Sequence, residues 1–388
     1  SYFSQLRLLP LAAEAADRLM DSLLGSDPSL DGLKRELVAR TEGTPLFVEE
    51  TVRALAEAGA LSGRPGDYRP TRAVTSFEIP STVQAVIAAR IDRLAPASKN
   101  LLQIASVIGR DVPLAVLQHV AKLPDDALQE ALGDLRAAEF LHEAQLLPDV
   151  VYAFKHALTH EVAYGSVLRE RRRAIHVEIV QAIETLNRDR IDEQVEHIAH
   201  HAVKGRLWDH AVRYLFRAAS KAIQRSAHRQ ALAFIDQGLE LIPKLPDGAE
   251  RMRLELDYWK ARGVTMMATK GWSAQDVSDA YVRAQALAEA LADERELFVV
   301  LRGRGQFHMT RGEAQIARVF GDRCLALSDK AGDPGMRIET HHLFWSNSLF
   351  MGDYAGTHHH AEHGIADYDR ERDHRLTYVY SGHDPGVC

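Results

Sequence analysis

A histidine at the boundary between a predicted strand and a predicted helix is the first residue able to do chemistry. Residues 150–154 form a short β-prone run, and His156 follows where the next helix would begin. A histidine at a helix N-terminus can donate a hydrogen bond to an anion, and the free backbone N–H groups there add to the attraction. A half-buried histidine with only a packing role is the alternative interpretation.

A Gly-Thr-Pro turn between two predicted helices is the second candidate. Gly43 and Pro45 stand between the helical patterns 30–41 and 49–60. Such a turn places a rigid, partly apolar corner on the surface. The structural alternative is a helix ended by glycine, followed by a helix begun by proline.

Histidine pairs and an arginine run suggest metal or nucleic-acid sites. His197 and His201 have the i, i+4 spacing of zinc ligands, and His363 follows a histidine run at 358–360. No acidic or cysteine partner completes a ligand set, so we expect solvated helix faces and no metal. The run 169–173 holds four arginines, but a glutamate interrupts it and no aromatic stripe accompanies it, so nucleic-acid binding is not expected.

The motifs of self-sufficient catalysis are missing from the sequence. No lysine is preceded by glycine and followed by serine or threonine, so the chain has no phosphate-binding P-loop. The G-x-S-x-G, H-E-x-x-H and C-x-x-C patterns are also absent. We therefore expect a chain that is not catalytic alone and that binds no cofactor tightly.

The composition is that of a globular protein in a reducing compartment. The chain has 388 residues, enough for two or three domains, and its 46% apolar content suits a packed core. A net charge of −7 gives no general attraction to nucleic acid or anionic membrane. With only Cys324 and Cys388, no disulfide framework is possible, so we expect a cytoplasmic location. No apolar run approaches the roughly 18 residues of a membrane span.

The elements around the two candidates predict a mainly α fold. Helical patterns occupy 11–24, 30–41 and 49–60, and a stretch rich in glycine and proline at 62–79 reads as a loop. Beyond it, helices lead to two β-prone runs and then to another helix. That order is typical of a winged helix-turn-helix.

The chain from residue 191 onward is predicted to be an α-solenoid of tetratricopeptide type. A period of 40 residues aligns small residues, aspartates and glycines: Ala286 with Ala326 and Ala366, Asp293 with Asp333 and Asp373, and Gly312 with Gly352. Two antiparallel helices per unit need about this length. The solenoid is the surface expected to bind a partner. Large aromatic residues there are expected mostly to pack between helices: Trp208, Tyr258, Trp259, Trp272 and Trp345.

Several runs resemble STAND-type signalling ATPases. The runs are 43–50, 79–94 and 154–164, the last followed by the arginines of 169–173. The closest resemblance is to bacterial proteins that join a class III adenylate/guanylate cyclase domain, an AAA/STAND module and tetratricopeptide repeats. LuxR-type regulators come next.

The resemblance implies a domain order for the chain. It assigns five segments: the last strand of a truncated nucleotide-binding core at 1–9, a helical lid at 10–61, a linker at 62–79, a winged-helix domain at 80–190, and the solenoid at 191–388. The abrupt ends, including 382–388, favour a piece of a longer protein.

The resemblance also implies roles for both candidates. In the family, a Gly-x-Pro motif packs near the adenine, and Gly43 and Pro45 match it. A winged-helix histidine contacts the β-phosphate of ADP, and His156 matches it. The acidic residue that commonly follows that histidine is Ala157 here.

The implied protein is a nucleotide switch that controls an output domain, with ATP or ADP and Mg²⁺ bound in the intact parent. Its partners would be an upstream nucleotide-binding core, the output domain and a protein or small-molecule effector on the solenoid. A membrane partner is not expected. Two alternatives remain open, namely a tetratricopeptide adaptor with no nucleotide role and part of a LuxR-type transcription regulator.

Overall fold

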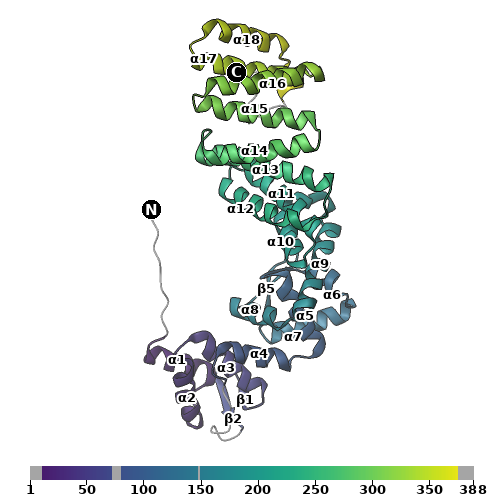
Figure 1. Ribbon diagram of the computed structural model, residues 1–388. Coiled ribbons are helices and arrows are strands. Elements are labelled where there is room, and N and C mark those ends of the chain that lie inside the picture. The colour runs from purple at the N-terminus through teal and green to yellow at the C-terminus, as the bar shows by residue number, and fades with distance from the viewer. Residues whose placement is uncertain (1–10, 72–79, 147–148, 375–388) are drawn as a thin grey trace. The chain divides into compact units, whose positions relative to one another are not determined.

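The protein is mainly α-helical, as the sequence predicts (Figure 1). The chain divides into two compact units, residues 1–186 and 187–388. The predicted strand at 1–9 and the segment 382–388 lie outside the part of the chain that the structure describes. This structure is a computed structural model, and it describes residues 11–71, 80–146 and 149–374.

The first helices of the N-terminal unit bury apolar residues that recur at helical spacing. They are α1 (Ala13–Leu24), the 3-10 helix η1 (Pro28–Leu30), α2 (Asp31–Thr41) and α3 (Pro45–Glu57). Helix α3 begins earlier than the predicted start at residue 49, because the fixed φ of Pro45 suits the first helical position. The shared core includes Met20, Leu24, Leu33, Leu37, Val48 and Val52.

A β-hairpin occupies part of the stretch that the sequence reads as a loop. Strand β1 (Leu61–Arg64) pairs antiparallel with β2 (Asp67–Pro70). Gly63 needs its positive φ of 119°, and a Cβ there would lie 2.2 Å from the Asp67 carbonyl oxygen. Glycine is therefore required inside β1, opposite Tyr68, where the backbone of the second strand approaches closely.

Helices surround a small antiparallel sheet in the rest of this unit. The helices are α4 (Val83–Arg93), α5 (Pro96–Ile108), α6 (Leu114–Ala121), α7 (Asp125–Ala137), α8 (Ala157–Ser166) and α9 (Arg169–Leu186). The strands β3 (Asp111–Pro113), β4 (Leu141–Gln145) and β5 (Val151–Phe154) lie in the order β3-β5-β4. The predicted hairpin is present as β4 and β5. The sequence did not predict β3, because three residues are too few for an alternating pattern.

The second unit is a stack of antiparallel helix pairs (Figure 1). Its elements are η3 (Arg188–Glu193), α10 (Val195–Gly205), α11 (Trp208–Gln224), α12 (His228–Leu241), η4 (Ile242–Lys244), α13 (Ala249–Lys270), α14 (Gln275–Ala290), α15 (Glu294–Thr310), α16 (Ala314–Ala331), α17 (Pro334–Phe350), α18 (Tyr354–Asp367) and α19 (Arg370–Asp373).

The predicted period of 40 residues corresponds to these helix pairs. Gly312 and Gly352 turn the chain between α15 and α16 and between α17 and α18, with φ of 76° and 74°. Asp293 and Asp333 cap α15 and α17 by accepting hydrogen bonds from backbone N–H groups. Asp373 breaks the pattern, because it lies inside α19.

Small residues let neighbouring helices of the stack approach closely. The ring of Tyr258 lies against Gly238, and its hydroxyl donates a 2.6 Å hydrogen bond to the Val212 carbonyl oxygen. Tyr281 packs in the same way against Gly303. Within the described ranges, no helix has the length and apolar character needed to cross a bilayer.

Candidate functional site

His156 lies where the sequence places it, between β5 and α8. It is the N-cap residue of α8, with extended backbone angles of φ −134° and ψ 140°. Its side chain is half-buried and does not cap the helix. The Nε2 atom is buried and has no hydrogen-bond partner among the described residues. An imidazole nitrogen in this condition fits a hydrogen-bond partner from outside the described residues.

Successive contacts between aromatic rings hold α8, the helix that follows His156. The rings of Phe154 and His160 meet edge to face at 5.0 Å, and His160 stacks on Tyr164 at 6.2 Å. The Nε2 atom of His160 lies 2.9 Å from the Ser106 carbonyl oxygen of α5. The guanidinium of Arg172 covers the Tyr164 ring at 4.1 Å. The position of α8 is therefore fixed from β5, α5 and α9.

Gly43 and Pro45 form the turn that starts α3. Gly43 has φ 67°, and its carbonyl oxygen accepts a 3.0 Å hydrogen bond from the Leu11 N–H. A Cβ at Gly43 would lie 2.8 Å from the Leu11 carbonyl oxygen, so only glycine fits without a shift. Pro45 is exposed at the first helical position. Both residues thus have the structural roles expected of them, and the proline ring is open to contact.

The two candidate turns are on different elements. No hydrogen bond, ion pair or ring contact within the described ranges joins Pro45 or Gly43 directly to His156. The connection runs through packing, since α3 contacts α4 and α4 contacts α8. Their relative position therefore depends on what fixes α3 against α4 and the sheet.

Arg90 of α4 is the main polar link to α3, and the sequence analysis did not single it out. Its guanidinium donates to Glu57 at 2.9 and 3.0 Å from Nε, and also to Glu50. The Arg90 and Glu50 side chains are only 1% and 2% exposed. Burial lowers the pKa of Arg90, but hydrogen bonds and charges from Glu57 and Glu50 outweigh burial and raise it overall. The sequence contains a sign of this role, because Arg90 is a charged residue on the same helical stripe as the apolar Val86 and Ile87.

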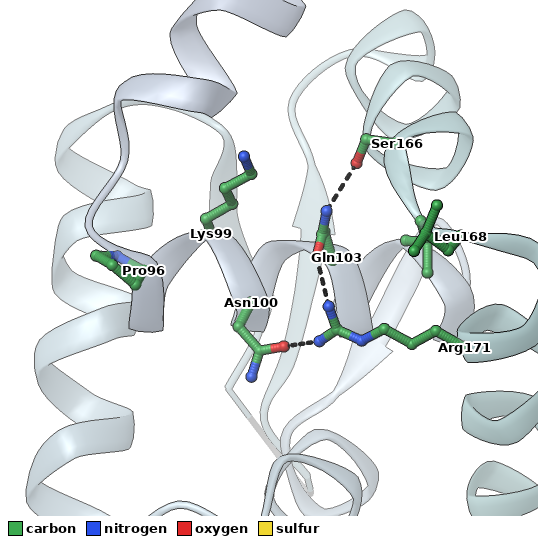
Figure 2. Close-up of a pocket in the computed structure, with 8 residues that line it drawn as sticks. Pro96, Lys99, Asn100, Gln103, Ser166, Leu168 and Arg171 are labelled. Carbon is green, nitrogen blue, oxygen red and sulfur yellow. Dashed lines mark hydrogen bonds between the residues drawn. The ribbon is translucent and has the colours of Figure 1, made fainter.

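A separate cleft of about 600 Å³ opens beside the C-terminal end of α8 (Figure 2). Arg171 lines it and is held by neutral amides, with 3.1 Å to Gln103 Oε1 and a second bond to Asn100 Oδ1. Gln103 in turn donates to Ser166 at 3.1 Å. Leu168 at the rim is 77% exposed. The cleft lies at the opposite end of α8 from His156, so the two are different places.

The histidines and aromatic residues of the second unit differ in how far they are buried and in what they contact. Among the described residues, no group of three or more His, Cys, Asp or Glu side chains is arranged to hold a metal ion. Tyr258 is fully buried, whereas Trp272 is 38% exposed. Trp345 stacks on His342 at 5.4 Å, and Lys244 covers the Trp208 ring at 4.2 Å. Most of the aromatic residues therefore pack against neighbours.

Comparison with known proteins gives three results. No protein-family model matches the chain. The uncharacterized protein R02095 of Rhizobium meliloti (strain 1021) is 26% identical over 359 residues, which are 89% of this chain and 33% of the relative. The chain therefore spans about a third of the length of that relative.

Among solved structures, the chain is similar to a Signal Transduction ATPase with Numerous Domains (STAND) protein with a tetratricopeptide repeat sensor from Pyrococcus horikoshii. The TM-score is 0.33 and the identity 12%, and the match covers 92% of this chain and 54% of that one.

Proposed function

We propose that this chain is the lid, sensor and receptor portion of a nucleotide-dependent signalling switch that controls an output domain, a class III nucleotide cyclase. The observation that carries the proposal is the buried, unpartnered Nε2 of His156 at the start of α8. Leaving such an atom without a hydrogen bond costs about 1–3 kcal/mol. A phosphate oxygen that accepts from Nε2 would remove this cost.

The surroundings of His156 suit an anion better than a cation. Helix α8 has 10 residues and no acidic residue in its first turn, so its positive end is not neutralised locally. Backbone N–H groups of that turn point out of the helix, next to the imidazole. We infer that His156 donates to the β-phosphate of ADP, a group that supplies negative charge at this end of the helix.

The turn at Gly43 and Pro45 would hold the base. The exposed pyrrolidine ring of Pro45 is rigid and apolar, and the turn is fixed by the hydrogen bond between Gly43 and Leu11. A flat adenine packs on such a ring without ordering a flexible side chain. We propose no magnesium ligand in this chain. The effector would bind on the helix pairs of the second unit and shift the equilibrium between two states of the switch.

The test is an NMR titration of the 388-residue chain, labelled at its histidines, with ADP and with AMP. We expect ADP to shift the His156 signal and AMP, which has no β-phosphate, to leave it in place. His156→Gln identifies the signal by removing it. The matched control is His358→Gln, which changes an exposed histidine of α18.

Two outcomes would contradict the proposal. The first is a His156 signal that does not move at millimolar ADP, which would remove the observation that favours the switch over the two alternatives. The second is ATP turnover by the chain alone that His156→Ala abolishes, because we expect no measurable hydrolysis.

A further inference from the structure

We infer that Glu139 is a positioning residue, whose carboxylate fixes the turn of His156 against the helix that begins at Pro45. The inference rests on the proposed function, because the two turns that it connects, at Pro45 and at His156, are those of the proposed nucleotide site. Its contacts form what we call the charged junction. The junction consists of three acidic and three basic side chains: Glu50, Arg53, Glu57, Arg90, Glu139 and Lys155.

The first half of the junction joins α3 to α4 and to the corner after α7. Arg90 binds Glu50 and Glu57 of α3 and also donates a 2.8 Å hydrogen bond to the Ala138 carbonyl oxygen. Its guanidinium covers the Phe140 ring at 4.7 Å. One buried cation thus touches α3 and both neighbours of Glu139.

The second half joins α3 to the residue before His156. The Oε2 atom of Glu139 lies 2.6 Å from a terminal nitrogen of Arg53, and the same oxygen accepts from Lys155 Nζ. The backbone N–H of Lys155 donates to the Phe140 carbonyl oxygen at 3.2 Å. Lys155 is therefore fixed at both its backbone and its side chain by the corner at 139–140.

Glu139 adopts a conformation that its residue type disfavours. Its φ is 58°, in the left-handed region where glycine is the usual residue. A glycine would relax the backbone but remove the carboxylate shared by Arg53 and Lys155. Burial raises the pKa of Glu139, but the hydrogen bond from Lys155 and the charge of Arg53 outweigh it and lower the pKa overall. The carboxylate is thus charged at neutral pH and balances two cations.

A junction that positions the His156 turn and a junction that only holds α3 in place predict different effects of a substitution in α3. The shorter route from Arg53 of α3 to Lys155, the residue before His156, runs through the Glu139 carboxylate. A longer route runs through Glu50 and Arg90 to the corner at 138–140. If the junction positions that turn, removing the Arg53 cation must change the surroundings of His156. If the contacts only hold α3 in place, the change must stay within α3.

The experiment combines hydrogen exchange and histidine NMR on the 388-residue chain, without nucleotide. In Arg53→Gln we expect amides of residues 153–163 to exchange at least about threefold faster, because the local opening energy falls. We also expect the His156 Nε2 signal to move. Arg53→Lys, which keeps the charge, should restore both. The matched control is Arg136→Gln, which breaks the nearby ion pair with Glu143. It keeps the hydrogen bond from the Glu139 N–H to the backbone carbonyl of residue 136, and no ion pair joins the Arg136 side chain to the six junction residues among the described residues.

Glu139→Gln completes the design, because it removes the shared acceptor charge. We expect Arg53→Gln to add little to its effect at 153–163, since the shorter route from Arg53 to this segment runs through the same carboxylate. Unchanged exchange at 153–163 and an unmoved His156 signal in both variants would overturn the inference. Additive effects would also overturn it. None of these readouts uses nucleotide, so a failed ADP titration would leave this result intact, and the reverse also holds.

Discussion

The Nε atom of Arg302 lies 2.5 Å from a carboxylate oxygen of Glu339, and the two side chains are 4% and 0% exposed. The pair joins α15 to α17, the first helices of successive helix pairs. His342 of α17 lies 3.4 Å from the same guanidinium. Ion pairs also join α11 to α13, through Arg213 and Glu250, and α13 to α15, through Lys260 and Glu296, but their side chains are more exposed.

Removing one partner of the Arg302–Glu339 pair should be strongly destabilising. Glu339→Gln removes the negative charge that pairs with the buried Arg302 guanidinium, so we expect a loss of about 3–5 kcal/mol in the free energy of unfolding. The matched control is Glu294→Gln, which breaks an exposed pair with Lys330, also 2.5 Å long, and should cost less than about 1 kcal/mol. Urea denaturation followed by circular dichroism measures both. Equal losses would show that burial of the Arg302–Glu339 pair does not increase the cost of breaking it.

A methyl group at Gly238 should disrupt the packing of α12 against α13. The added Cβ would lie 2.2 Å from the Tyr258 ring, so one of the two helices must shift. We expect Gly238→Ala to destabilise by about 1–3 kcal/mol. In Gly133→Ala, where the Cβ meets nothing within 4 Å, the same substitution should stabilise α7 by up to about 1 kcal/mol. Melting temperatures that move in the same direction would contradict this contrast.

The pair α17 and α18 should lose stability in mild acid. The Nδ1 atoms of His341 and His360 are 3.1 Å apart. Burial, followed by the positive charge of His341 and His359, lowers the pKa of His360 to about 4. The unfolded chain has the ordinary value, near 6.5. The unfolded state therefore binds the proton first, so the stabilisation is complete above about pH 6.5 and is lost as the pH falls toward 4.

Hydrogen exchange of α17 and α18 between pH 7 and pH 5, corrected for the intrinsic rate, measures this loss. His360→Gln should flatten the pH dependence, and His358→Gln, at an exposed position, should leave it unchanged. A wild-type profile that stays flat over this range would contradict the assignment.

The thiol of Cys324 should not react with disulfide reagents in the folded protein. It is fully buried in α16, and burial raises its pKa to about 12. The thiolate is the reactive form, so a colourless disulfide reagent that releases a dye should find no target at pH 8. The measurement uses Cys388→Ser, which leaves one thiol in the chain. A full equivalent of dye before denaturant is added would show that α16 opens readily.

The sequence predicted the helices and turns that carry the candidate site better than it predicted their connections. His156 and Pro45 both begin helices, as their types and spacing indicate. Proline fixes its own φ, so local chemistry decides its place. The repeat of 40 residues was also visible, because the α15–α16 and α17–α18 turns both use a glycine with positive φ, Gly312 and Gly352.

What the sequence could not reveal depends on contacts between distant residues. Glu57 and Arg90 are 33 positions apart, and no local pattern pairs them. The left-handed backbone of Glu139 is set by the corner around it rather than by its own preference. Glycines at 63 and 66 resemble those of a loop until two strands are seen to pair across them.

The helix pairs of the second unit imply a stepwise response to mechanical tension. In the described part of this unit, the main contacts of each pair are with its neighbours along the stack, so one pair can separate from the others. The turn glycines 312 and 352 are 40 residues apart, and that length of chain, fully extended, spans about 140 Å. Stretched along its length, this unit would lengthen in steps of at most that size, and separating the pairs would expose rings that a glycine had accommodated, such as Tyr258 and Tyr281.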